Sequence, residues 1–149
     1  MSQTYFGSTL RSGSGTLTDT TDGGYVVLVQ TVTVTTVAAG TAVNGTITLP
    51  AGSQIIEMFA DKIVAPVVGG GTATTYNAAV GSTSSGTEYM PATNMASIAR
   101  TSGTLVVADV SAMANINSNT TVYCSISPNG TISTTQGQYL FTIVYAQKV

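Results

Sequence analysis

The sequence predicts an all-β fold of seven or eight strands, arranged as a single-domain β-sandwich or jelly roll, and three observations support this prediction. First, several segments alternate apolar and polar residues with a period of two, which is typical of β-strands. Second, threonine occurs 27 times, and this β-branched residue favours strands over helices. Third, turns that contain glycine or proline separate the alternating segments, as they do in sandwiches and jelly rolls.

The first half of the chain contains three predicted strands. Residues 25–37 form the longest; its apolar start predicts burial on both faces, and its alternating end predicts one wet face. Asn44-Gly45 follows as a hairpin signal. In the segment 46–64, TITLPAGSQIIEMFADKIV, two alternating runs flank Pro50-Ala51-Gly52, which provides a turn.

The middle of the chain is less regular. We expect residues 66–72, which contain three consecutive glycines, to form a flexible loop rather than a phosphate-binding loop, because another strand at 74–80 follows instead of a helix. Residues 81–100 are the longest irregular stretch, and their apolar residues predict a packed loop. Within it, residues 95–99 could form one helical turn.

The last third contains three further predicted strands. Residues 105–108 form a short buried strand, and residues 109–119 connect it to the next. Residues 120–127 alternate cleanly and place Cys124 in the core as a small apolar residue. Residues 138–146, QYLFTIVYA, carry aromatic or aliphatic side chains on both faces, which predicts a central strand.

The chain has the length of one domain, and two parts differ in composition. Residues 25–149 are expected to form the sandwich, whereas residues 1–24 consist mainly of Gly, Ser, Thr and Asp and are expected to form an extended N-terminal arm. A disordered tail is the alternative. If the arm orders against a partner protein, the residues that could bind are those with apolar, aromatic or basic side chains: Tyr5, Phe6, Leu10 and Arg11.

Charge and composition exclude several classes of function. Only 7% of the residues are charged, against about 25% in an average globular protein, so the surface has little electrostatic protection against association. Four basic residues and a net charge of −2 argue against binding to nucleic acid or to an anionic membrane. The N-terminus lacks the basic and apolar regions of a signal peptide, so we expect the protein to be made and kept in the cytoplasm.

Residues that usually carry out catalysis or bind metals are also scarce. The chain has no histidine and one cysteine, which excludes imidazole-based catalysis and cysteine-rich zinc sites. Glu57 and Asp61 lie about 13 Å apart along one predicted strand. This is farther than the distance between the two catalytic carboxyl groups of a glycosidase. We therefore expect no catalytic residues, no metal and no cofactor; the protein is predicted not to be an enzyme.

Four stretches of the sequence resemble a family of small all-β structural proteins encoded among the head genes of tailed bacteriophages. They are TITLPAGSQIIEMFADKIV (46–64), AAVGSTSSGTEYMPATNM (78–95) with the following Ala99-Arg100, VYCSISPNGT (122–131) and QYLFTIVYAQ (138–147). In such proteins a strand ending in Leu-Pro-Ala-Gly leads into an apolar strand, and an aromatic, valine-rich strand ends the chain. The resemblance covers about residues 25–147, and its motifs are structural rather than catalytic.

The resemblance implies a virion component, namely a decoration or cement protein that binds the outer capsid surface and strengthens contacts between capsomers. Its implied partners are the major capsid protein and two further copies of the chain in a homotrimer. It implies synthesis in the cytoplasm of the host bacterium.

The leading alternative is a receptor- or glycan-binding module of a phage head fibre or tail. Glycan sites often present exposed aromatic side chains on which sugars stack. Tyr76 and Tyr89, beside the glycine-rich and polar loops, are the candidates for that role.

Overall fold

The computed structural model describes residues 25–105 and 118–148 of the chain, and this part contains eight β-strands. The prediction of an all-β fold with seven or eight strands is confirmed. The strands are β1 (Tyr25–Thr35), β2 (Val43–Leu49), β3 (Ser53–Val64), β4 (Tyr76–Gly81), β5 (Met90–Asn94), β6 (Arg100–Ser102), β7 (Thr120–Pro128) and β8 (Gln138–Lys148).

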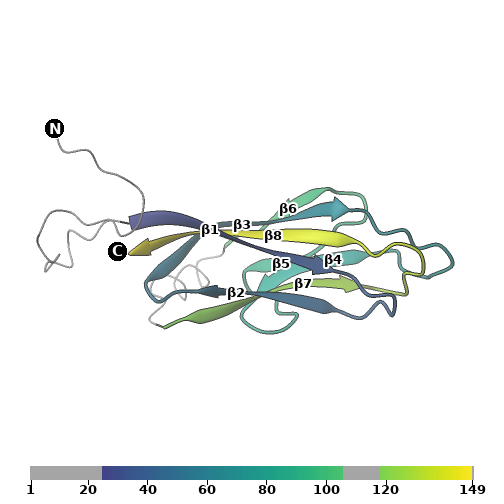
Figure 1. The fold of residues 1–149 in the computed structure, drawn as a ribbon, viewed down its shortest axis with the longest axis horizontal. Coiled ribbons are helices and arrows are strands. Elements are labelled where there is room, and N and C mark those ends of the chain that lie inside the picture. The colour runs from purple at the N-terminus through teal and green to yellow at the C-terminus, as the bar shows by residue number, and fades with distance from the viewer. Residues whose placement is uncertain (1–24, 106–117, 149) are drawn as a thin grey trace, which may run out of the picture.

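The strands form two four-stranded sheets that lie face to face (Figure 1). The first sheet has the order β1-β8-β3-β6 and the second has the order β2-β7-β4-β5. Among the paired strands, β1 pairs with β8, β2 with β7, β3 with β6 and β4 with β5, all antiparallel. This nested pairing of the first strand with the last, the second with the second-last and so on is the arrangement of a jelly roll.

β8 lies between β1 and β3, so the predicted central position of the last strand is confirmed. It pairs with β1 without interruption from Tyr25↔Lys148 to Thr35↔Gln138. Its pairing with β3 shifts register twice, near Ile55 and near Lys62. Because β8 has partners on both sides, its backbone hydrogen bonds join the N-terminal strand to the middle of the chain.

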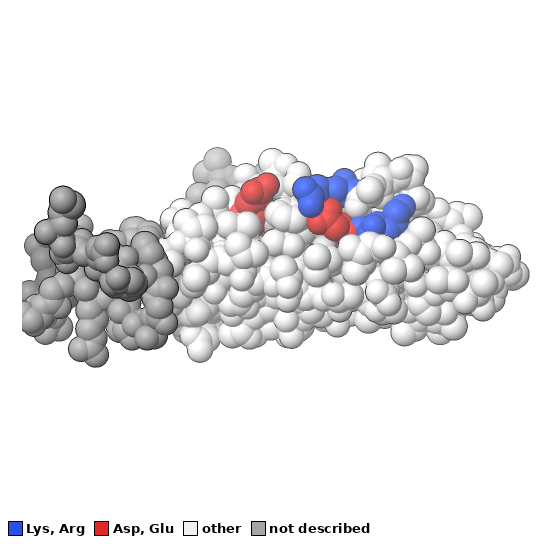
Figure 2. Space-filling view, turned by 45° about the horizontal axis from the view of Figure 1, so that its top comes forward, with Lys and Arg blue, Asp and Glu red and all other residues white. Residues whose placement is uncertain are grey.

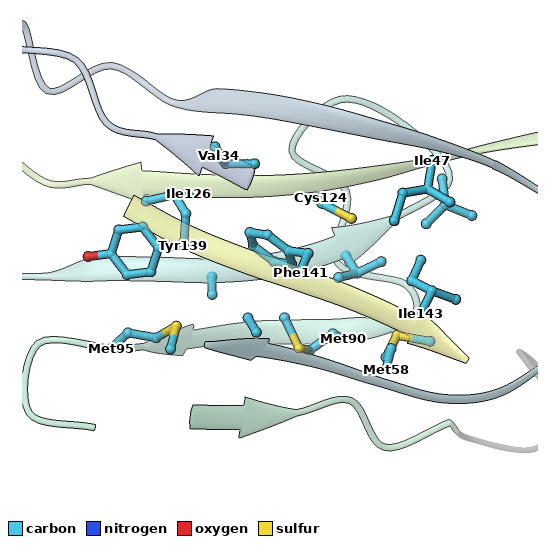
Figure 3. Packing of buried hydrophobic residues seen from close by; sticks show 14 of the residues in the cluster. Val34, Ile47, Met58, Met90, Met95, Cys124, Ile126, Tyr139, Phe141 and Ile143 are labelled. Carbon is cyan, nitrogen blue, oxygen red and sulfur yellow. The ribbon is translucent and has the colours of Figure 1, made fainter. Parts of the chain in front are cut away.

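The core fills the space between the two sheets (Figure 3). From the first sheet, β8 supplies Tyr139, Phe141 and Ile143, each with 0% exposure. They meet apolar side chains of the second sheet, among them Met90 and Cys124, which are also fully buried. The predicted core position of Cys124 is confirmed, and burial raises the pKa of its thiol to about 12. The alternation seen in the sequence therefore separates core from surface on β8.

The stretch 81–100 is more regular than the sequence predicts, because it contains β5 and begins β6. The helical turn expected at residues 95–99 is wrong. The carbonyls of Met95 and Ala96 accept hydrogen bonds of 2.8 and 2.9 Å from Lys62 Nζ, and the backbone N–H of Ala96 donates to Asn94 Oδ1 at 3.0 Å. These contacts draw the segment onto β3 instead of letting it coil. Of the strand expected at 105–108, only Leu105 lies within the described residues, and it is not in a strand.

The glycine-rich segment 66–72 is a loop, as predicted, but it is tied firmly to the connection between β7 and β8. Val67 forms a β-bridge with Thr135, and the N–H of Ser133 donates to the carbonyl of Val68 at 3.0 Å. Nearby, Asn129 Oδ1 accepts hydrogen bonds from the N–H groups of Thr74 and Thr75, at 2.7 and 2.9 Å. The prediction of a flexible loop did not anticipate these bonds, which involve residues more than fifty positions apart.

Candidate interaction surface

The outer face of the β1-β8-β3-β6 sheet is the most distinctive surface of the described chain, and we call it the outer face below. Cross-strand pairing places Val27 beside Ala146 and Val29 beside Val144 on this face. Val27 and Val29 are 60% and 58% exposed. Beyond these valines the same face of β1 carries Thr31, Thr33 and Thr35, so this part of the outer face is uncharged and partly apolar.

The exposure of β1 corrects a prediction made from the sequence. The apolar start of this strand was expected to be buried on both faces, yet Val27, Leu28 and Val29 are 60%, 37% and 58% exposed. The reason is its position: β1 is the edge strand of its sheet, and Val27 and Val29 lie on the face that points away from the second sheet. Farther along, where β2 lies close, Val34 is only 2% exposed.

Charged side chains gather along the other half of the outer face, over β3 and β6 (Figure 2). Asp61 and Arg100 are directly opposite each other on these strands and form a two-point ion pair, Nε–Oδ1 at 2.6 Å and Nη2–Oδ2 at 2.8 Å. The guanidinium also stacks on Phe59, 4.5 Å from the ring centroid. The hydrogen bond from Arg100 lowers the pKa of the Asp61 carboxyl. Because the pair is partly solvent-exposed, it orients these side chains more than it stabilises the fold.

The second sheet presents a different exterior, because the loop between β4 and β5 reaches across it. Asn44 on β2 donates to Ser84 Oγ at 2.9 Å and accepts from the N–H of Ser85 at 3.0 Å. Ala79 and Ser125 lie on the outer side of the second sheet, because their neighbours along β4 and β7 point into the core. They are nevertheless only 4% and 1% exposed. In the part of the chain that the structure describes, the two sheets therefore differ: the second has a loop bonded over it, and the first has a largely open outer face.

The two tyrosines considered for glycan binding are not brought together by the fold. Tyr76 is 5% exposed, and burial raises the pKa of its hydroxyl. Tyr89 is half-buried and packs against the core. The pairs Asn77↔Asn94 and Val80↔Met90 place these tyrosines at opposite ends of the β4–β5 ladder, about 16 Å apart along the strands. A ring has to be exposed to stack on a sugar, so the structure gives no support to a site at Tyr76.

The remaining candidates from the sequence fall outside what the structure describes. Tyr5, Phe6, Leu10 and Arg11 all belong to residues 1–24, which are not described. Among the described residues, no group of three or more Cys, Asp or Glu side chains could hold a metal ion. The same residues contain no helix long and apolar enough to cross a membrane.

Comparison with known proteins gives one informative likeness. No family model matches the sequence. No curated protein matches it either. A chain in the capsid asymmetric unit of cyanophage Pam1 is similar in structure, with a TM-score of 0.60, 20% sequence identity, and coverage of 93% of this chain and 97% of that one.

Two weaker likenesses are to chains in phage capsid structures. One is the acidic stable capsid of Helicobacter pylori bacteriophage KHP30, with 12% identity, a TM-score of 0.45 and coverage of 80% of this chain and 93% of that one. The other is the capsid of Ralstonia phage GP4, with 15% identity, a TM-score of 0.48 and coverage of 85% and 86%. These two TM-scores are too low to bear on the fold. The chain is thus similar in fold to a chain of the cyanophage Pam1 capsid.

Proposed function

We propose that this protein is a structural component of a bacteriophage virion, a decoration or cement protein that binds the outer capsid surface and reinforces contacts between capsomers. The observation that carries this proposal is the likeness to a chain of the Pam1 capsid, which covers 93% of this chain and 97% of that one. Because both chains are covered almost entirely, the likeness is not limited to one part of either chain.

The surface of the described chain supports a role in an assembly. Five charged side chains belong to the described residues with described side chains, and four of them lie on β3 and β6. A surface with so little charge associates easily, and a neutral face of apolar and hydroxyl groups suits contact with other proteins. A shell component needs many such contacts of modest strength rather than one deep pocket.

The proposal includes the partners and the location of the protein. Its partner on the shell is the major capsid protein, and three copies of the chain form a homotrimer. The protein is made in the cytoplasm of the host bacterium and ends on the capsid surface. Its role there is mechanical and involves no catalysis, cofactor or metal.

The number of copies per particle tests this function. We expect quantitative mass spectrometry of purified particles to find hundreds of copies, in a simple ratio to the major capsid protein. Adding the purified protein to particles that lack it should raise the temperature at which the shells open. A few to a few dozen copies would instead indicate a fibre or tail module, and absence from the particle would overturn the virion role.

The arm can be tested in the same particles. Replacing the two aromatic anchors, Tyr5→Ala with Phe6→Ala, should weaken capsid binding by at least about tenfold, because buried aromatic anchors often contribute about 2 kcal/mol or more to an interface. Leu10→Ala and Arg11→Ala should have smaller effects in the same direction. The measurement is the concentration that half-saturates capsids, compared with the control Thr4→Ala with Ser8→Ala. Equal saturation by the aromatic variant and the control would show that the arm does not bind the shell.

The glycan-binding alternative makes a different prediction for Tyr89. If this half-buried residue stacks on a sugar, Tyr89→Ala should abolish binding to glycan arrays and leave capsid saturation unchanged. The burial of Tyr76 leaves this alternative with one of its two candidate aromatic residues.

A further inference from the structure

The first half of β1 has a free edge. β1 is the last strand on its side of the sheet, and the outer-edge backbone groups of residues 25–30 have no strand partner among the described residues. Along the second half, β2 of the other sheet contacts the inward-facing side chains of β1: a Cβ atom on Gly45 would lie 2.7 Å from a methyl group of Val32. The free edge therefore includes the part of β1 that carries the exposed valines.

This edge lacks the features by which proteins usually prevent strand pairing. Edge strands are commonly kept short, or they carry charged residues, proline or a β-bulge. β1 has eleven residues, YVVLVQTVTVT, with no charge and no proline. Its pairing with β8 runs through every residue without a register shift. An open strand of this kind is a template for a further strand, so we expect it to be covered when the protein works.

We propose that β1 of a second copy of this chain, one from a neighbouring trimer, covers this edge, in antiparallel pairing with Leu28 opposite Leu28. In this register Val27 of each copy faces Val29 of the other on the outer face. The four valines then form one apolar cluster at the centre of a continuous eight-stranded sheet. The stripe of charged residues on β3 and β6 lies two strands away from the contact in each copy.

The charge of the strand favours a second copy as the occupant. A twofold contact places each residue near its own counterpart, so any charge in the paired segment meets a like charge and opposes pairing. β1 contains no charged residue, and Glu57 and Asp61 are on β3. The valine pairing also buries more apolar surface than pairing with a segment of Thr, Ser and Gly would.

The contact is small. A pairing of about seven residues buries much less than the roughly 800 Å² per partner of a standard interface, so it forms transiently in dilute solution and more fully where many copies are crowded together. This inference does not depend on binding to a capsid, because two copies can pair in solution. The test below therefore uses the purified full-length protein alone and traps the contact covalently.

Cysteine substitutions test the register. Cys124 is 0% exposed and its thiol has a pKa of about 12, so the wild-type protein should give no cross-link. Val27→Cys and Val29→Cys, mixed and oxidised with oxidised glutathione, should yield a disulfide-linked heterodimer. Each variant alone should yield at least about fivefold less dimer, because equivalent cysteines are then diagonal neighbours about 7–8 Å apart, beyond disulfide range.

Two controls make the outcome decisive. Ile63 is 51% exposed on the same sheet but two strands away, so Ile63→Cys should form no disulfide-linked dimer under the same conditions. If the Ile63 variant cross-links as readily as the mixture, the dimers reflect collision, and the proposal is wrong. The absence of a disulfide-linked dimer from the Val27 and Val29 mixture at high protein concentration would also overturn it.

Hydrogen exchange separates a second copy from residues 1–24 of the same chain as the strand that covers β1. With a second copy, protection should increase with protein concentration at alternate residues of 26–30, namely those whose N–H groups point away from β8. Protection that is independent of concentration would mean that the chain covers its own edge, and it would overturn the proposal. If the amides at this edge stay unprotected at every protein concentration, the proposal is also wrong.

Discussion

Replacing Phe141 by alanine should destabilise the protein by about 3–5 kcal/mol, the range for deleting a fully buried phenylalanine. Phe141 has 0% exposure on β8, the central strand of the first sheet, and its ring packs between the two sheets (Figure 3). The loss has two causes: the ring no longer leaves water on folding, and a cavity remains because β8 is held by strands on both sides. The measurement is urea unfolding followed by circular dichroism.

Phe59 provides a matched control, because it is the same residue type on the neighbouring strand but lies on the outer face. Phe59→Ala removes a half-buried ring and its stacking with Arg100, so the loss should be about 1 kcal/mol. Equal losses for the two variants would mean that the division of β8 and β3 into an inner and an outer face is wrong.

Gly40→Ala should be the most damaging small substitution in the loops, with a loss of at least about 2 kcal/mol. Gly40 has a φ of +70°, a conformation that costs an L-residue about 1–2 kcal/mol. An added Cβ atom would also lie 1.9 Å from the carbonyl oxygen of Gly130, so the β1–β2 loop would have to separate from the β7–β8 connection. That movement would also strain the hydrogen bond of 3.0 Å from the N–H of Ile132 to the carbonyl of Ala38.

Gly70→Ala is the corresponding control in the same group of loops. Its nearest neighbour would be Ser133 Oγ at 3.9 Å, and its φ is not positive, so the methyl group fits. We expect a stability equal to that of the wild type or higher by up to about 1 kcal/mol, since alanine restricts the unfolded chain. Both variants are compared by thermal unfolding. If Gly40→Ala is as stable as Gly70→Ala, the β1–β2 loop does not lie as close to the β7–β8 connection as the structure shows.

The sequence was informative about strands because their signal is local. Alternation placed six of the eight strands within a few residues of their positions, and the aromatic and aliphatic residues on both faces of residues 138–146 identified the central strand. β5 and β6 were missed because they are short and rich in residues that also favour loops. The three-residue β6 exists only through its pairing with β3, as Asp61↔Arg100 illustrates.

The candidate surface could be predicted only in part. The low charge indicated a protein that associates with others, but the residues chosen from the arm lie outside the described part of the chain, and Tyr76 is buried. The exposed valines of β1 were missed because a run of β-branched residues has the same pattern in a central strand as in an edge strand. The available signal was that the first predicted strand is uncharged and that no strand was predicted before it in the chain. A strand in that position can lie at the edge of a sheet.

By itself, the sequence determined that this chain forms an all-β sandwich, because strand propensity, alternation and turn chemistry act between near neighbours. Only the tertiary structure decided which strand lies at an edge, which sheet face a loop covers and which loops bond to each other. Those features depend on pairings such as Val29↔Val144, between residues more than a hundred positions apart. The exposure of a side chain depends on which residues pack against it. Those residues are distant in the sequence, so the local sequence does not identify them.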